Sequence, residues 1–235
     1  MTFDADSLRK IADLERRLKQ LESQAGTGFD TIFAGSMPFD HFNKPALNSA
    51  WSWDAVTFGG TPSGVSLASV PSNLSILHSA ITTVFFLKKA WTAVNGSYVS
   101  ARFMPTVDTI SGLRIDDGTD NNYSEIRIVN GATQGTKKLQ FRFRTGGGAV
   151  TTTDKIDNIP NHPISLLMQY SSSPNTFGAY GLEPHSCVNG AGGWAYFGNL
   201  AAFPGAPTRA GLLHSNVTLV GSASRRTLVD WYHEG

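Results

Sequence analysis

The densest group of oxygen-bearing side chains runs from Asp116 to Asn122, in the order Asp-Asp-Gly-Thr-Asp-Asn-Asn. Calcium binds about six to eight oxygens of this kind, which makes Asp116, Asp117 and Asp120 weak candidates for a calcium site. The spacing does not match an EF-hand loop, and Asp-Gly followed by Asn-Asn also forms ordinary turns. We therefore expect a hairpin turn and no cofactor, with calcium as the alternative.

Histidine and cysteine give no signal of a metal site or a nucleophile. No two of the six histidines lie three to five positions apart, so zinc is not indicated. The single cysteine, Cys187, cannot form an internal disulfide and is interpreted as a small packed side chain. Stability is therefore not expected to depend on oxidation.

Sugar binding needs an aromatic ring beside polar side chains, because the ring stacks on a pyranose while amides and carboxylates bind its hydroxyls. The best such stretch runs from His185 to Asn199, where two aromatic residues of one strand face follow a glycine-rich loop. Tyr123, which directly follows the Asp116–Asn122 turn, is a second aromatic ring that could contact a sugar. The candidate glycan contacts are Tyr196, Trp194, Asn189, His185 and Tyr123.

Core packing is the alternative for several of these rings. It is at least as good an explanation for Trp194, and it is favoured for Trp51 and Trp53, which share one face of an early strand. For Trp91, which follows Lys88-Lys89, a loop position and a core position stay open.

An N-terminal helix is the element best suited to present such a domain. Residues 10–15 and 17–22 repeat one pattern, cation, apolar, two spacers, apolar, glutamate, seven positions apart. The apolar heptad positions a and d are Ile11, Leu14, Leu18 and Leu21. In a parallel bundle the g residue of one chain meets the e residue of the next, which pairs Lys10 with Glu15 and Arg17 with Glu22. The pattern resembles a short trimerisation motif, so we expect a homotrimer through residues 7–25, with a dimer or a helix packed on its own domain as alternatives.

Composition describes a turn-rich β body. The chain of 235 residues has 24 glycines and only 16% charged residues, with a formal net charge of +1. No basic stripe suggests nucleic acid, no apolar run suggests membrane insertion, and residues 1–25 do not resemble a signal peptide.

After residue 38 the pattern changes from helical to alternating. Turn signals at Asp117-Gly118, Asn130-Gly131 and Gly146-Gly147-Gly148 separate short runs. The expected strands are 51–56, 65–70, 81–87, 98–103, 112–116, 124–129, 139–144, 164–170, 177–181, 194–197, 209–213 and 227–232. The expected fold is mainly β, an antiparallel two-sheet jelly-roll sandwich, with a coiled-coil helix at 1–25, a linker at 26–37 and the sandwich at 38–235.

Several segments resemble the concanavalin A-like sandwiches, a group that includes laminin-G-like and carbohydrate-binding modules. They are FDHFNKPALNSAWSW at 39–53, SARFMP at 100–105, GLRIDDGTDNNYSEIRI at 112–128, RAGLLHSN at 209–216 and RRTLVDWYHEG at 225–235. These are mainly packing and turn residues, so the resemblance concerns the fold more than the activity.

The same superfamily contains laminarinase-like and lichenase-like hydrolases, which carry Glu-x-Asp-x-Glu or Glu-x-Asp-x-x-Glu on one strand. That motif places two carboxylates on one face as nucleophile and general acid. This chain has five glutamates, and outside the helix none has an acidic residue two positions away. Glu125 is expected on a strand surface beside Arg127. The sequence therefore predicts a protein that is not an enzyme.

A parallel coil followed by a lectin-like sandwich resembles virion proteins of tailed bacteriophages. The expected function is a homotrimeric tail fibre, tail tip or capsid appendage that binds host-surface polysaccharide, located in the virion with other virion proteins as partners. Three weak sites on one stalk would gain avidity. One alternative is a purely structural decoration or collar protein, and another is a polysaccharide hydrolase with an atypical site.

Overall fold

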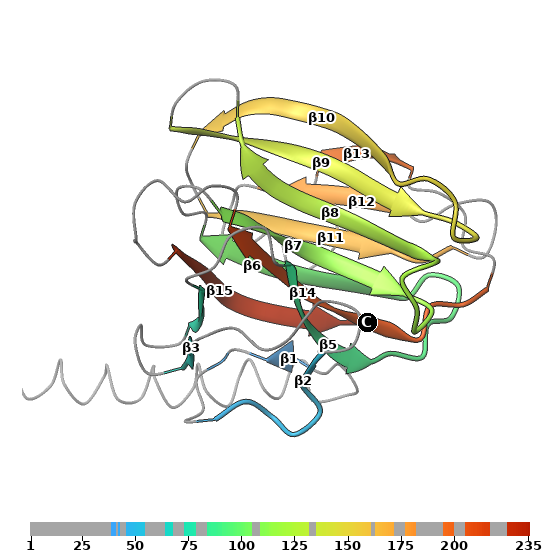
Figure 1. The fold of residues 1–235 in the computed structure, drawn as a ribbon, viewed down its shortest axis with the longest axis horizontal. Helices are drawn as coiled ribbons and strands as arrows, with labels where there is room; N and C mark the ends of the chain where they lie inside the picture. The colour runs from blue at the N-terminus through green and yellow to red at the C-terminus, as the bar shows by residue number, and fades with distance from the viewer. Residues whose placement is uncertain are drawn as a thin grey trace, which may run out of the picture. The chain divides into compact units, whose positions relative to one another are not determined.

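Two antiparallel sheets face each other in the computed structural model, which describes residues 39–40, 42, 46–54, 64–67, 73–78, 84–104, 109–131, 135–160, 163–171, 177–181, 195–199, 205–216 and 225–235 (Figure 1). Residues 39–235 belong to one compact unit. The expected coiled coil and linker lie outside the described residues, and so does Cys187. The described part of the chain contains no helix long and apolar enough to span a membrane.

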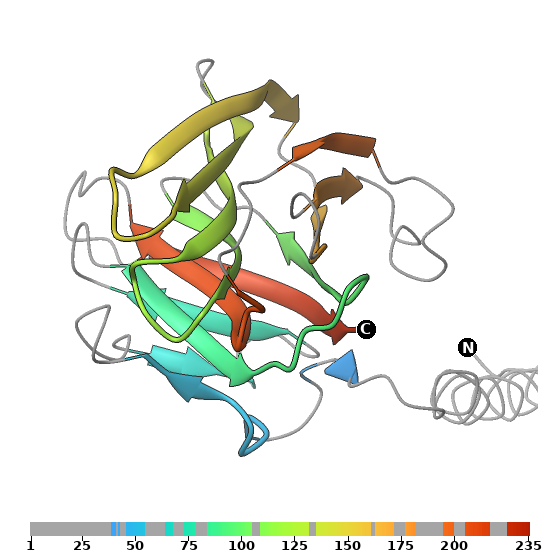
Figure 2. The same cartoon turned by 90° about the vertical axis from the view of Figure 1, so that its right-hand side faces the viewer.

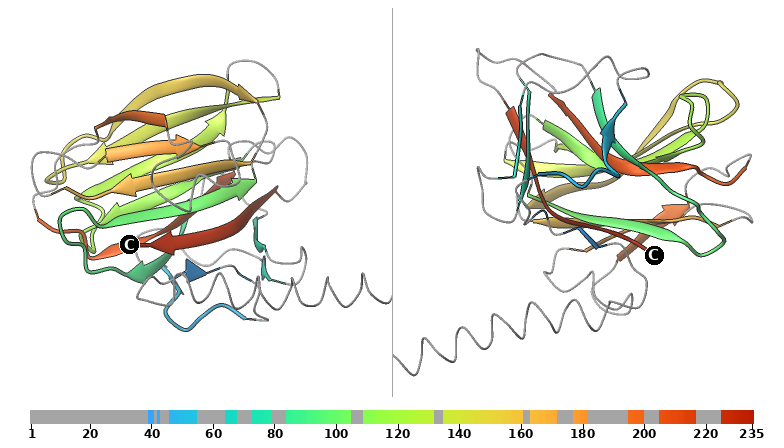
Figure 3. Two further views of the ribbon diagram at one scale, coloured as in Figure 1. Left: turned by 180° about the vertical axis from the view of Figure 1, so that it is seen from behind. Right: turned by 90° about the horizontal axis from the view of Figure 1, so that it is seen from below.

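The eight-stranded sheet has the order β13-β12-β11-β6-β15-β4-β3, and β1 also pairs with β15. Its strands are β1 (Phe39–Asp40), β3 (Gly64–Ser66), β4 (Leu74–His78), β6 (Tyr98–Met104), β11 (Ile164–Gln169), β12 (Phe177–Gly181), β13 (Ala195–Asn199) and β15 (Arg225–Glu234). Seen from behind, the red β15 lies beside the green β6 (Figure 3), and in the sheet it separates β6 from β4.

The seven-stranded sheet has the order β10-β9-β8-β7-β14-β5-β2. Its strands are β2 (Ser52–Trp53), β5 (Val84–Ala90), β7 (Thr109–Asp116), β8 (Tyr123–Asn130), β9 (Thr136–Arg144), β10 (Thr151–Pro160) and β14 (Arg209–Asn216). Viewed along the sandwich, β10 and β13 belong to opposite layers (Figure 2).

Alternation along the strands builds one core between the sheets. In the seven-stranded sheet Leu87, Leu113 and Leu212 point inward, and in the eight-stranded sheet Ile76 and Val99 do so. Each is fully buried. Burying an aliphatic side chain of this size stabilises the fold by about 1.5–3 kcal/mol relative to exposure.

The early tryptophans join this core, as favoured from the sequence. Trp51 meets Tyr232 edge-on with ring centroids 4.8 Å apart, and Trp53 packs against the core beside Phe85. Trp91 is buried in the same cluster, so of the two positions left open by the sequence the core position is the one observed.

The expected two-sheet β-sandwich is confirmed, and its strand orders are consistent with a jelly roll. All twelve expected strands are present, eleven of them with shifted ends, whereas β1, β4 and β10 were not expected. Gly146 and Gly147 adopt positive φ in the β9–β10 turn, as their sequence predicts. The expected tight turn at Asn130-Gly131 is not formed: Asn130 ends β8 and pairs with Lys137, neither residue has a positive φ, and the Gly131 amide donates to the Thr136 carbonyl at 2.9 Å.

Candidate functional site

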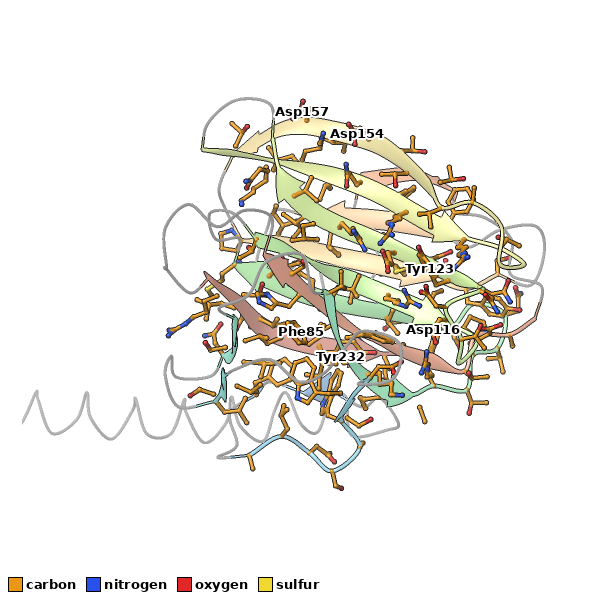
Figure 4. The ribbon with its side chains drawn as sticks, viewed as in Figure 1. Phe85, Asp116, Tyr123, Asp154, Asp157 and Tyr232 are labelled. Carbon is orange, nitrogen blue, oxygen red and sulfur yellow. The ribbon has the colours of Figure 1, made fainter. Side chains whose placement is uncertain are left out.

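The face of the seven-stranded sheet that points away from the core is lined by charged side chains, and we call it the outer face. Because alternate residues of a strand point to opposite sides, Arg114 and Asp116 of β7 share this face with Tyr123, Glu125 and Arg127 of β8. The labelled Tyr123 and Asp116 lie near each other at neighbouring strand ends, and Asp154 lies on edge strand β10 (Figure 4).

Arg114 is the centre of this face and is fully buried. Its guanidinium donates from Nε to Asp116 at 2.9 Å, from Nη1 to Glu125 at 2.8 Å, and from Nη2 to Asp120 at 3.0 Å. The same group lies 4.1 Å from the ring centroid of Tyr123. A planar fork suits such multiple contacts, so Arg114 fixes the positions of three carboxylates and one ring.

Glu125 lies directly opposite Arg114 in the β7–β8 ladder and is surrounded by three guanidinium groups. Its Oε1 accepts from Arg114, and its Oε2 accepts from Arg127 Nε at 2.7 Å. Arg142 Nη1 lies 3.6 Å from Oε2. Burial alone would raise the pKa of Glu125, but the charges of Arg127, Arg114 and Arg142 outweigh it and lower the pKa. Glu125 is therefore an ionised, buried carboxylate, and the expectation of a strand surface residue is wrong.

The charged network continues towards the other edge of the sheet. Arg209 of β14 donates from Nη2 to Asp116 at 3.0 Å and from Nη1 to Asp54 at 2.7 Å. Lys88 of β5 lies 3.7 Å from the same Asp54 oxygen. Cations and carboxylates thus alternate from the end of β2 to β9.

Exposure increases across the outer face towards β9 and β10. Glu125 and Arg114 are buried on β8 and β7, whereas Arg142 and Arg144 of β9 are partly exposed, each with 28% of the side chain accessible. Asp154 of β10 is 56% accessible. The solvent-accessible part of the network is therefore the β9–β10 side.

The predicted glycan contacts are not gathered at one place. Tyr123 is buried, with Arg114 over its ring and the Arg142 guanidinium 5.7 Å from its centroid. It does not offer a free ring face to a sugar, contrary to expectation. Tyr196 belongs to β13 in the other sheet. His185, Asn189 and Trp194 lie outside the described residues.

The three candidate calcium ligands each have other partners. Asp116 accepts hydrogen bonds from Arg114 and Arg209, and Asp120 is paired with Arg114. Asp117 accepts from Thr119 and Asn122 within the β7–β8 loop. Burial would raise the pKa of Asp117, but these hydrogen bonds lower it. The described residues contain no cluster of three or more side chains that could hold a metal ion. The turn favoured from the sequence is observed at residues 117–122, where the Asp117 amide donates to the Asn122 carbonyl. A bound calcium ion remains a prediction.

Sequence reasoning missed the arginines that build this face. One signal was available: Arg114 and Asp116 alternate along one strand, as do Glu125 and Arg127 along the next. Alternating charges at two-residue spacing place opposite signs on one face. Their pairing across strands required the register, which the sequence did not give.

Comparisons with known proteins identify the fold. No family model matches the chain, and no curated protein matches its sequence. A β-glucanase of Bacillus licheniformis matches with TM-score 0.56 and 15% identity, over 85% of this chain and 98% of that chain. The transglycosylase Crh5 matches with TM-score 0.55 and 10% identity, over 86% of this chain and 84% of that one. A pseudo β-1,3-glucanase of Mycobacterium tuberculosis matches with TM-score 0.54 and 15% identity, over 84% and 97%.

These neighbours contradict the predicted function. The expected phage virion protein, whether tail fibre, tail tip or decoration protein, has no counterpart among them, since they are described as glucanases, a transglycosylase and a pseudo-glucanase. The prediction that the chain is not an enzyme is contradicted by the same finding. At these identities the likeness establishes the fold alone, a β-sandwich shared with carbohydrate-active proteins.

Proposed function

We propose that this protein is carbohydrate-active and engages polysaccharide along the outer face of the seven-stranded sheet. The observation that carries the proposal is the ordered set of charged side chains that crosses this face from Asp54 to Arg142. The glucanase-like neighbours, matched over most of both chains, support the same class of ligand.

Polysaccharide recognition requires hydrogen-bonding groups that are already in place when the ligand arrives. Arg144 illustrates such preorganisation, because its Nε donates to the Gly148 carbonyl at 2.8 Å and its Nη2 to the Gly147 carbonyl at 3.0 Å. Side chains fixed by several partners lose little entropy on binding. The partly exposed residues of β9 therefore form the best-prepared binding surface among the described residues.

Cleavage of the polysaccharide is the second candidate, and one carboxylate pair favours it. Asp120 and Glu125 both accept hydrogen bonds from Arg114, at 3.0 and 2.8 Å, so two carboxylates lie on either side of one guanidinium, and glycosidases use a pair of carboxyl groups. Asp120, with 45% of its side chain accessible, would act as the general base: it would take a proton from a water whose oxygen bonds to the anomeric carbon as the glycosidic bond breaks, and the leaving oxygen would take a proton from solvent. Glu125 becomes a nucleophile only if the Arg114 and Arg127 contacts open.

Binding and cleavage of β-1,3- and β-1,3-1,4-glucans test both parts. We expect retention on insoluble glucan, and, if the second candidate holds, release of reducing ends that is lost in Asp120→Asn. Asp154→Asn is the matched control, because it neutralises another exposed carboxylate of the same face. Absence of both binding and cleavage with every polysaccharide tested, neutral or charged, would refute the proposed function.

A further inference from the structure

The outward side chains of β9 form a row that is open to solvent. Lys138, Gln140, Arg142 and Arg144 alternate with inward residues and are all partly exposed. Successive members lie about 7 Å apart, because each strand residue advances the chain by about 3.4 Å. The row therefore presents three cations and one amide along roughly 20 Å of strand.

Cations outnumber carboxylates among the ion-paired residues described on this face. The ion pairs that join its described residues involve seven cations but five carboxylates. The carboxylates are Asp54, Asp116, Asp120, Glu125 and Asp154, and each already serves at least one cation. Part of the positive charge is thus left to solvent or to a ligand.

The excess is greatest around Glu125, where one carboxylate faces three guanidinium groups. Arg114 and Arg127 hold its two oxygens by short hydrogen bonds. Arg142 lies 3.6 Å away, beyond hydrogen-bond length, and this is its one ion pair among the described residues. Its 28% accessible side chain is therefore the cation best able to take an anion from solution.

Resting on the proposed function, we propose that the polysaccharide is anionic, and that a carboxylate or sulfate group of the sugar binds Arg142, with Arg127 and Arg144 on either side. A guanidinium binds either group through two parallel hydrogen bonds. The row along β9 would hold the adjoining sugars, and Gln140, whose Nε2 donates to Asp154 at 2.7 Å, would supply its remaining amide groups to hydroxyls.

A neutral glucan would leave this charge excess unused, which makes matched polymers the decisive probes. Dextran sulfate against dextran, and polygalacturonate against its methyl ester, differ only in charge. We expect the full-length protein to bind a charged member at least about tenfold more tightly than its neutral partner, the change expected for one charge-assisted contact. The better of the two charged polymers identifies sulfate or carboxylate as the group recognised.

Single substitutions test whether binding depends on Arg142 itself or only on attraction between opposite net charges. Arg142→Gln should weaken binding of the charged polymer about tenfold, and Arg142→Lys should weaken it less, because the charge stays but the fork is lost. Arg226→Gln removes one charge from the other sheet and should leave binding unchanged. Circular dichroism and thermal unfolding of each variant report that the sandwich is intact.

Three results would overturn the inference, and they differ in whether the proposed function survives. Equal losses in Arg142→Gln and Arg226→Gln would mean that attraction depends on net charge alone. Preference for dextran, laminarin or lichenan over the charged polymers would refute an anionic ligand while supporting the proposed function. Lack of binding to all polymers would refute both.

Discussion

Arg114 and Glu125 lie directly opposite each other in neighbouring strands, joined by a 2.8 Å hydrogen bond, and neither side chain reaches solvent. A one-residue slip between β7 and β8 would turn one of these charges towards Leu113 and Ile126 in the core. The pair therefore fixes the register of the two strands that carry the candidate site.

Loss of the Glu125 charge should destabilise the protein strongly. Glu125→Gln leaves the cations of Arg114, Arg127 and Arg142 facing a neutral amide, and we expect a loss of about 3 kcal/mol or more in the free energy of unfolding. Denaturation with urea measures it. Asp154→Asn breaks an exposed pair with Lys138 and should cost less than about 1 kcal/mol. Equal effects would mean that the buried network adds nothing specific.

Acid should weaken the fold first through His233. Burial lowers the pKa of His233 from 6.5 to about 4, so between these values the unfolded chain takes up a proton that the folded chain does not. The contribution is fully present above pH 6.5 and falls as the pH drops to 4, by up to about 3 kcal/mol. Urea midpoints from pH 7 to 4 should fall more steeply in the native protein than in His233→Asn. Parallel curves would contradict the assignment.

Gly211 is required for the close approach of β14 to β5. A Cβ at this position would collide with the carbonyl oxygen of Leu87, part of the backbone of the paired strand. We expect Gly211→Ala to cost about 3 kcal/mol or more, because the strands must separate. Gly205→Ala meets no atom and should change stability by less than about 0.5 kcal/mol, which differential scanning calorimetry can verify.

The predicted coil remains a separate hypothesis about assembly. If residues 7–25 form a parallel trimer, replacing Leu18 and Leu21 by Asp buries charge in the seam and should give a monomer. Light scattering coupled to size exclusion would then show one third of the native mass with an unchanged β spectrum. A monomeric native chain, or an unchanged mass, would reject the hypothesis.

Much of the sandwich was predictable from the sequence because its strands alternate clearly. The run at 124–129 and the strand β8 differ by one residue at each end, and 177–181 matches β12. Strand β10 was missed because Thr-Thr-Thr-Asp-Lys is an edge segment with polar residues on both faces. Strand β4 lies inside the sheet, but its short Leu-Ser-Ile-Leu-His run gave too weak a period.

The candidate site was much less predictable, because it depends on pairing between distant strands. Asp54 and Arg209 are 155 positions apart, yet they form a 2.7 Å hydrogen bond. The hydrolase motif has two carboxylates on one strand face, whereas β8 presents Glu125, Arg127 and Val129 on its outer face. Burial of Glu125 was also missed, since a sequence does not show how long arginine side chains from neighbouring strands cover a carboxylate.

The position of β15 also dictates when this protein can fold on the ribosome. Strands β1 and β4 pair with β15, and β3 joins the sheet through β4, so all three wait for residues 225–234 to emerge. Strand β14 likewise separates β5 from β7. Such long loops are slow to close, and the growing chain holds unpaired strand edges until residues 225–234 have been made. Production in cells should therefore benefit from slow expression at low temperature and from chaperones that shield those edges.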